Sequence, residues 1–310
     1  MTYIEHINSL LRARLAVAQD TVVFGQNIVA GSCLSGLTRG IRVPEGSQIL
    51  QTQNSENTLT GIGLGMMLRG VSSIYFLKQL DFLLLGMDHL VNSYNIVRRL
   101  HAGSSFTLFA IVVDQGYEGP QSCLNNLDDF CSMAHIPGYV ISSGWDAEVV
   151  LNRHLFAPGL KIICVSQRLF GTALPSWSEP VETDGAGEIF RYAQGEDVTI
   201  VSCNFSFPQA LQTWRYWQER GLTASLFSVS GASTSDWSMI LQDLQRTRKL
   251  LVLDDSKSDN RSSDRFLLAV RESALADRVL VQRRRFAPEW LKPNPDLLEV
   301  VPAELFQQLQ

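Results

Sequence analysis

The stretch ENTLTGIGLG, from Glu56 to Gly65, decides the fold of this 310-residue chain. Glu56 stands at the start of an apolar segment, and Gly61 follows after four intervening residues. Asn54 or Ser55 can cap a helix that begins here and hold its first turn rigid. Glycines four residues apart leave one helix face without side chains, so another helix, for example at a subunit interface, can approach closely. The spacing alone is equally compatible with an ordinary amphipathic helix that has a polar first turn.

Outward from this helix, helical and strand-like segments alternate, which is typical of parallel sheets with helices on both faces. The pattern predicts strands at 21–24, 49–51, 73–77, 106–113, 162–165, 198–203, 224–229, 249–253 and 279–282. It predicts helices at 3–19, from Glu56 onward, and at 83–99, 127–134, 207–220, 237–245 and 264–274.

The chain is long for a single hydrophobic core, so two domains are expected. Gly, Pro, Ser and acidic residues dominate between the two runs of alternating elements, which is typical of a linker. We therefore expect an α/β protein with a first domain over 1–172, a linker over 173–196 and a second domain over 197–310. Each domain is expected to have three layers, α/β/α, around a mostly parallel sheet.

Composition excludes several classes of function. The net charge of -5 gives no general attraction to nucleic acid or anionic membranes, and no apolar run approaches a membrane helix of about 20 residues. The N-terminus lacks the pattern of a signal peptide. The five cysteines are scattered without a C-x-x-C pair, which favours buried thiols in a reducing compartment. We expect a cytoplasmic protein.

Four blocks of sequence resemble thiamine-diphosphate enzymes. The first runs from Glu56 to Asn92, and the others are TVVFGQNI (21–28), LDDFCSMAHIPG (127–138) and GEDVTIVS (195–202). Together they are most similar to the beta subunit of 2-oxo acid dehydrogenases and to the C-terminal half of transketolases. The resemblance implies a pyrimidine-binding domain followed by a transketolase C-terminal-like domain.

In that family, the glutamate of the E-x4-G motif bonds to the pyrimidine ring of the cofactor, and this role falls on Glu56. An aromatic ring lies against the same pyrimidine, which corresponds to Phe82. Asp88 and Asn92 match residues that hold the local helix in place. The resemblance thus implies one catalytic residue, Glu56, and two cofactor-binding residues, Glu56 and Phe82.

The sequence also departs from the family. The loop before residue 127 carries no histidine, and Gln121, Ser122 and Asn125 take its place as candidate substrate contacts. An amide can orient a carbonyl group but cannot move a proton near neutral pH. The family's acidic pair after the first strand appears as Gln26 and Asn27.

The family's motif for diphosphate and magnesium, G-D-G followed by a distant asparagine, does not occur in the sequence. The chain is therefore expected to hold no metal itself. The resemblance implies an alpha-type partner subunit that holds Mg²⁺ and the diphosphate, in an alpha2beta2 heterotetramer.

These observations predict a beta-type subunit of a two-component thiamine-diphosphate enzyme. Two reactions stay open, namely decarboxylation of a 2-oxo acid with acyl transfer and ketol transfer between sugars. The alternative from another class is a degenerate, non-catalytic subunit that stabilises a catalytic alpha partner. The presence of Glu56 disfavours this alternative, whereas the absence of the loop histidine favours it.

Overall fold

The first half of the chain forms a six-stranded sheet in which every pair of neighbouring strands is parallel. The computed structural model describes residues 1–100, 103–114, 125–174, 179–284 and 298–309. The strand order is β2-β1-β3-β4-β6-β5. The strands are β1 Thr21–Gly25, β2 Gln48–Gln51, β3 Ser72–Leu77, β4 Ser105–Val112, β5 Gly138–Ile141 and β6 Gly159–Ser166.

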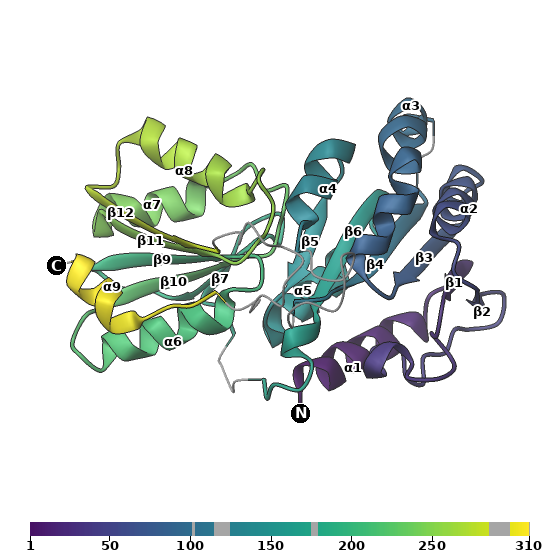
Figure 1. The fold of residues 1–310 in the computed structure, drawn as a ribbon, viewed down its shortest axis with the longest axis horizontal. Helices are drawn as coiled ribbons and strands as arrows, with labels where there is room; N and C mark the ends of the chain where they lie inside the picture. Colours follow the sequence, from purple (N-terminus) through teal and green to yellow (C-terminus); the bar gives the residue numbers. More distant parts are fainter. Residues whose placement is uncertain (101–102, 115–124, 175–178, 285–297, 310) are drawn as a thin grey trace, which may run out of the picture.

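Helices cover both faces of this first sheet (Figure 1). They are α1 Tyr3–Leu15, α2 Glu56–Leu68, α3 Asn95–Val97, α4 Leu127–Ala134 and α5 Gly144–His154. Helices α1 and α5 lie on one face, and α2, α3 and α4 lie on the other. Every residue of β4 is buried, which explains its continuous apolar sequence.

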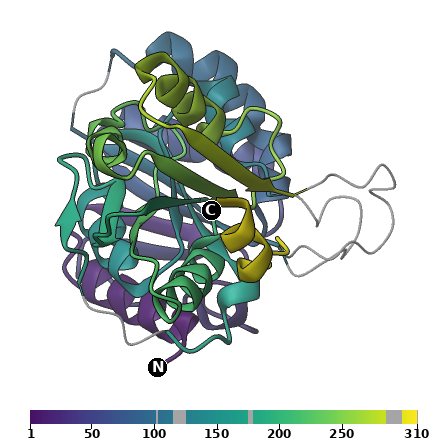
Figure 2. The same ribbon diagram turned by 90° about the vertical axis from the view of Figure 1, so that its left-hand side faces the viewer.

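The second half forms another six-stranded sheet, in the order β12-β11-β9-β10-β8-β7. Four parallel strands make up most of it: β9 Val198–Cys203, β10 Ala224–Val229, β11 Lys249–Asp254 and β12 Arg278–Arg283. Its helices are α6 Phe207–Gln218, α7 Ser238–Thr247, α8 Ser262–Ser273 and α9 Pro302–Leu309. Figure 2 looks onto this half, with α8 above the sheet and α6 and α9 below it. The predicted α/β class with two three-layer units is confirmed.

The predicted linker over 173–196 needs a correction. It contains β7 Glu182–Thr183 and β8 Ile189–Ala193, which pair antiparallel at the edge of the second sheet. The elements β5, α5 and α9 also lie outside the sequence prediction. Where one domain ends and the next begins stays a prediction.

The predicted continuous helix over 83–99 is wrong. The chain forms a 3-10 helix, η2 Leu80–Gly86, then a π-helix, η3 His89–Tyr94, and one turn of α-helix, α3. A Cβ atom added to Gly86 would lie 2.4 Å from Oγ1 of Thr60 on α2. This close packing sets the path of the segment, and irregular helices of this kind often occur near functional sites.

Candidate functional site

The carboxyl ends of the six strands of the first sheet lie along one edge, because all the strands run parallel. From β1 the chain crosses to β2 on one side and then returns to β3 on the other. The crevice between the ends of β1 and β3 is therefore a topological switch point, where ligands of open α/β sheets bind. Gln26 and Asn27 follow β1 at this point, and Lys78 and Gln79 follow β3.

A cavity with a volume of about 90 Å³ lies at this position, and we call it the switch-point hollow. Its floor includes apolar side chains from β4 and from the segment after β6, such as Ile111 and Phe170. Its polar lining consists of Asn27, Ser32, Ser35, Lys78, Gln79 and Gln167. Sequence reasoning found none of these except Asn27, because the others come together only when the sheet assembles.

Part of the wall of this hollow has an unusual backbone. Cys33, Leu34 and Ser35 have φ angles of 49°, 51° and 58° in succession, in the left-handed region. Non-glycine residues pay roughly 1–3 kcal/mol each for such conformations, and they concentrate at ligand sites. The strained turn brings Leu34 and Ser35 to the hollow.

Glu56 begins α2 at the same edge, directly after the loop that follows β2. Ser55 stands at the N-cap position, but its hydroxyl bonds to Oγ1 of Thr58 at 2.9 Å and makes no cap hydrogen bond. The Glu56 side chain is half-buried. Burial, and then the charge of Glu56, raise the pKa of Tyr75 on β3. Glu56 therefore faces the sheet closely enough for its charge to act on a core side chain.

Phe82 lies on η2, just after β3, and is half-buried. Asn92 donates a hydrogen bond to Oδ1 of Asp88 at 2.6 Å, across one turn of the segment that follows Phe82. This bond agrees with the expected positioning role of Asp88 and Asn92. The catalytic role of Glu56 and the cofactor contact of Phe82 stay predictions.

The glycines of α2 allow close approach, as the sequence indicates for Gly61. A Cβ atom added there would lie 2.9 Å from the imidazole ring of His89. Gly63, which the sequence argument passes over, is tighter, because its Cβ would lie 2.2 Å from the ring of Phe106 on β4. Gly65 faces open space.

Of the predicted substrate contacts, Gln121 and Ser122 lie outside the described residues. Asn125 is fully buried, and its Nδ2 donates to the backbone carbonyl of Asp255 in the second domain at 3.2 Å. The carbonyl of Asn125 accepts from the backbone amide of Lys257 at 2.8 Å. Asn125 thus joins the two domains, and its contact with substrate stays a prediction.

A buried ion-pair network lies next to this tether. The guanidinium of Arg168, just after β6, is 2.7 Å from Oδ2 of Asp255 and 3.6 Å from Oδ2 of Asp114. Burial raises the pKa of Asp114, while the charge of Arg168 lowers it. Burial and the neighbouring carboxylate of Asp254 raise the pKa of Asp128 well above its usual range.

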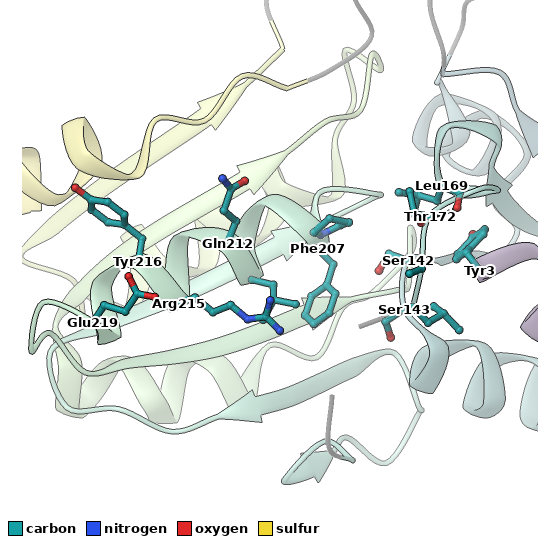
Figure 3. Close-up of a pocket in the computed structure, with 14 residues that line it drawn as sticks. Tyr3, Ser142, Ser143, Leu169, Thr172, Phe207, Gln212, Arg215, Tyr216 and Glu219 are labelled. Carbon is teal, nitrogen blue, oxygen red and sulfur yellow. Dashed lines mark hydrogen bonds between the residues drawn. The ribbon is translucent and has the colours of Figure 1, made fainter. Parts of the chain in front are cut away.

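A second cavity, with a volume of about 440 Å³, lies between the two domains (Figure 3). One wall is a face of α6 that carries Phe207, Gln212 and Arg215, and the opposite wall includes Tyr3 and Ser142. The hydroxyls of Tyr3 and Ser142 already donate hydrogen bonds within the protein, Tyr3 to the carbonyl of Ile141 and Ser142 to the carboxylate of Asp146. The cavity lies on the α1 and α6 side and includes neither Glu56 nor Phe82.

Within the described residues, no group of three or more His, Cys, Asp or Glu side chains is arranged to hold a metal ion. No helix in the same part of the chain is long and apolar enough to cross a membrane.

Comparisons with known proteins agree with this geometry. The beta-1 subunit of the pyruvate dehydrogenase E1 component of Oryza sativa subsp. japonica is 22% identical over 265 residues, covering 82% of this chain and 70% of the relative. The beta subunit of acetoin:2,6-dichlorophenolindophenol oxidoreductase of Cupriavidus necator is 23% identical over 270 residues, covering 81% and 78%. No family model matches the chain.

Among solved structures, a split-gene transketolase described as an inactive beta4 tetramer superposes with a TM-score of 0.65 at 12% identity. The match covers 92% of this chain and 88% of that one. The chain therefore has the fold of that transketolase chain, and its sequence is similar to the beta subunits of pyruvate dehydrogenase E1 and of acetoin oxidoreductase.

Proposed function

We propose that this chain is the beta-type subunit of a two-component thiamine-diphosphate enzyme that acts on a 2-oxo acid or a ketose. The observation that carries the proposal is the position of Glu56. Its carboxylate begins α2 at the carboxyl edge of a parallel sheet whose switch point holds a polar hollow. The relatives named above, all beta subunits, support the same class.

The residues at this edge fit the pyrimidine end of the cofactor. Glu56 is half-buried and bonds to no other side chain in the described part of the chain, so its carboxylate is available to a ring nitrogen. Phe82 is half-buried on the neighbouring segment and offers an aromatic face for stacking. When bound, the cofactor supplies a carbanion nucleophile and an electron sink for breaking or forming a bond next to a carbonyl group. In this proposal, Glu56 holds the proton shared with the pyrimidine ring, and Phe82 orients that ring.

We further propose that an alpha-type partner subunit binds the diphosphate end through Mg²⁺, in an alpha2beta2 complex. Exposed apolar side chains on the helical face that carries α2, η2 and α3 support this assembly. They are Ile62, Leu84, Leu85 and Ile96, each about half exposed or more. Closed symmetric assemblies commonly bury faces of this kind.

The experiment is a purification of the chain together with its alpha-type partner, followed by an assay of turnover with 2-oxo acids and ketoses. Glu56→Gln should leave the assembly intact and lower turnover about 100-fold or more, the usual scale for losing a positioned acid-base group. Glu45→Gln, which neutralises an exposed carboxylate before β2, is the matched control and should retain wild-type turnover.

Two results would contradict the proposal. Unchanged turnover of the Glu56→Gln complex would show that Glu56 has no catalytic role and is an ordinary residue of a helix terminus. A stable complex with full cofactor occupancy and no turnover on any substrate would instead favour the non-catalytic subunit, in line with the missing loop histidine.

The chain alone should bind thiamine diphosphate with Mg²⁺ weakly or not at all, and calorimetry measures this binding.

A further inference from the structure

Lys78 introduces a positive charge into the switch-point hollow. It follows the last residue of β3 and is the one cation among the described residues that line this cavity. The other polar lining groups are amides and hydroxyls, which are neutral and can donate hydrogen bonds. No carboxylate is among the described residues that line the hollow. The formal charge of the described lining side chains is therefore positive.

The ammonium group of Lys78 is not used to hold the fold together. Within the described part of the chain, the side chain makes no ion pair or hydrogen bond, and it is exposed. By contrast, the half-buried Arg168, which follows β6 two strands away, is fixed between Asp114 and Asp255. A lysine without an internal partner, at the ligand-binding edge of the sheet, is available to an external anion.

The size of the hollow limits the kind of group it can take. A volume of about 90 Å³ accommodates a carboxylate or a phosphate group together with a few waters, but not a whole sugar. A larger hollow of about 490 Å³ shares the wall residues Ser35, Gln167 and Phe170 and opens to solvent beside α1. The remainder of a substrate has room there. The strained backbone at Ser35 lies between the two spaces.

We propose that the switch-point hollow is the oxyanion subsite of this enzyme and that Lys78 is its specificity-determining residue. The subsite receives the charged group of an anionic substrate, either the carboxylate of a 2-oxo acid or the phosphate of a sugar phosphate. Lys78 supplies the charge, and Asn27 supplies a neutral hydrogen-bond donor. This inference rests on the proposed function for its substrate class, but binding of an anion to the hollow can be measured without catalysis.

The first experiment therefore uses the full chain without a partner. Pyruvate and inorganic phosphate are titrated separately into isotope-labelled protein, and amide chemical shifts at Lys78, Gln79 and Asn27 are followed by NMR. We expect at least one of the two anions to shift these signals. Lys78→Met should weaken that binding about 10-fold to 100-fold, the scale of one charge-assisted hydrogen bond, and Lys78→Arg should retain most of it.

Lys249→Met is the matched control. Lys249 stands at the amino end of β11, away from the carboxyl edge of the first sheet, and its removal lowers the net charge equally. It should leave anion binding unchanged. The inference fails if neither anion shifts the signals of the hollow, or if the Met variants at positions 78 and 249 bind equally well.

A second experiment uses the complex with the alpha-type partner. Lys78→Met should raise KM about 10-fold or more for the anionic substrate and leave KM for neutral dihydroxyacetone unchanged. A larger effect with pyruvate assigns the subsite to a carboxylate, and a larger effect with fructose 6-phosphate assigns it to a phosphate. An equal loss for dihydroxyacetone would overturn the specificity role. If the complex shows no turnover but still binds anions in a way that depends on Lys78, the proposed function is contradicted. The anion subsite is nevertheless supported.

Discussion

At the scale of single residues, Lys161 shows how a buried charge is tolerated in the first domain. Its side chain is 2% exposed, and Nζ donates to the backbone carbonyls of Ala157 and of Gly159, the latter at 3.0 Å. Burial lowers the pKa of Lys161 to about 7 from its ordinary value of 10.5. The protonated form is destabilised by the loss of water and partly compensated by the two carbonyls.

This lowered pKa makes stability depend on pH. Between about pH 7 and pH 10.5, the unfolded state binds more protons than the folded state, so the free energy of unfolding rises with pH from this source. Lys161→Met removes the effect. The free energy of unfolding of the wild type should therefore rise relative to that of the variant as pH rises above 7, by about 1.4 kcal/mol per pH unit. Urea unfolding at pH 6.5 and 9 measures it, and a difference that stays constant would show that the carbonyls hold Lys161 charged.

At the scale of elements, α2 is shaped by its three glycines, which have different surroundings. Gly63 packs directly against the ring of Phe106 on β4, whereas Gly65 faces open space on the same helix. Periodicity in the sequence predicts the glycine-bearing helix but cannot tell which glycine is crowded. The neighbours that decide this come from β4 and η3, about 30 to 45 residues further along the chain.

The two glycines should respond in opposite ways to alanine. Gly63→Ala forces a methyl group against Phe106 and should lower the free energy of unfolding by about 1–3 kcal/mol. Gly65→Ala gains helix propensity without a clash and should raise it by about 0.5–1 kcal/mol. Thermal unfolding of the isolated chain compares the two. If α2 packs against the alpha-type partner through Gly65, the Gly65→Ala variant should also bind that partner more weakly. Unchanged binding would show that Gly65 does not lie at the interface.

The elements that the sequence predicts best are those with one dominant local signal. Short segments rich in apolar residues give β9 and β10 their observed bounds, and a strong amphipathic pattern gives α4. The conformation of the segment over 80–97 is instead set by a tertiary contact, because Gly86 packs closely against Thr60. Strand β7 has two residues and lies in polar sequence, so its pairing with β8 leaves no periodic signal.

At the scale of the whole molecule, sequence reasoning finds part of the candidate site. Glu56 and Phe82 lie in one block of sequence that resembles known enzymes, so they can be named as candidates before the fold is seen. Lys78, Ser35 and Gln167 come from three separate segments and meet only where the ends of β1, β3 and β6 converge. Arg168 likewise reveals its role only when the second domain is in place.

Arg168 joins the two domains. Its guanidinium lies between Asp114 of the first domain and Asp255 of the second, and both carboxylates are buried. Arg168→Met leaves two buried carboxylates without their cation and should lower the free energy of unfolding by about 3–5 kcal/mol. Arg248→Met, which breaks an exposed ion pair with Asp277, is the control and should change stability little.

The sign of the pH dependence is a sharper test of the same contact. In the wild type, burial already raises the pKa of Asp114, and Arg168 opposes that rise. Without Arg168 the folded-state pKa rises further, so the folded state binds more protons than the unfolded state over a wider range, and stability falls as pH rises through it. The Arg168→Met variant should therefore lose more stability at pH 8 than at pH 5, measured by urea unfolding. An equal loss at both pH values would mean that Arg168 stabilises the junction by packing, with no part played by the charge of Asp114.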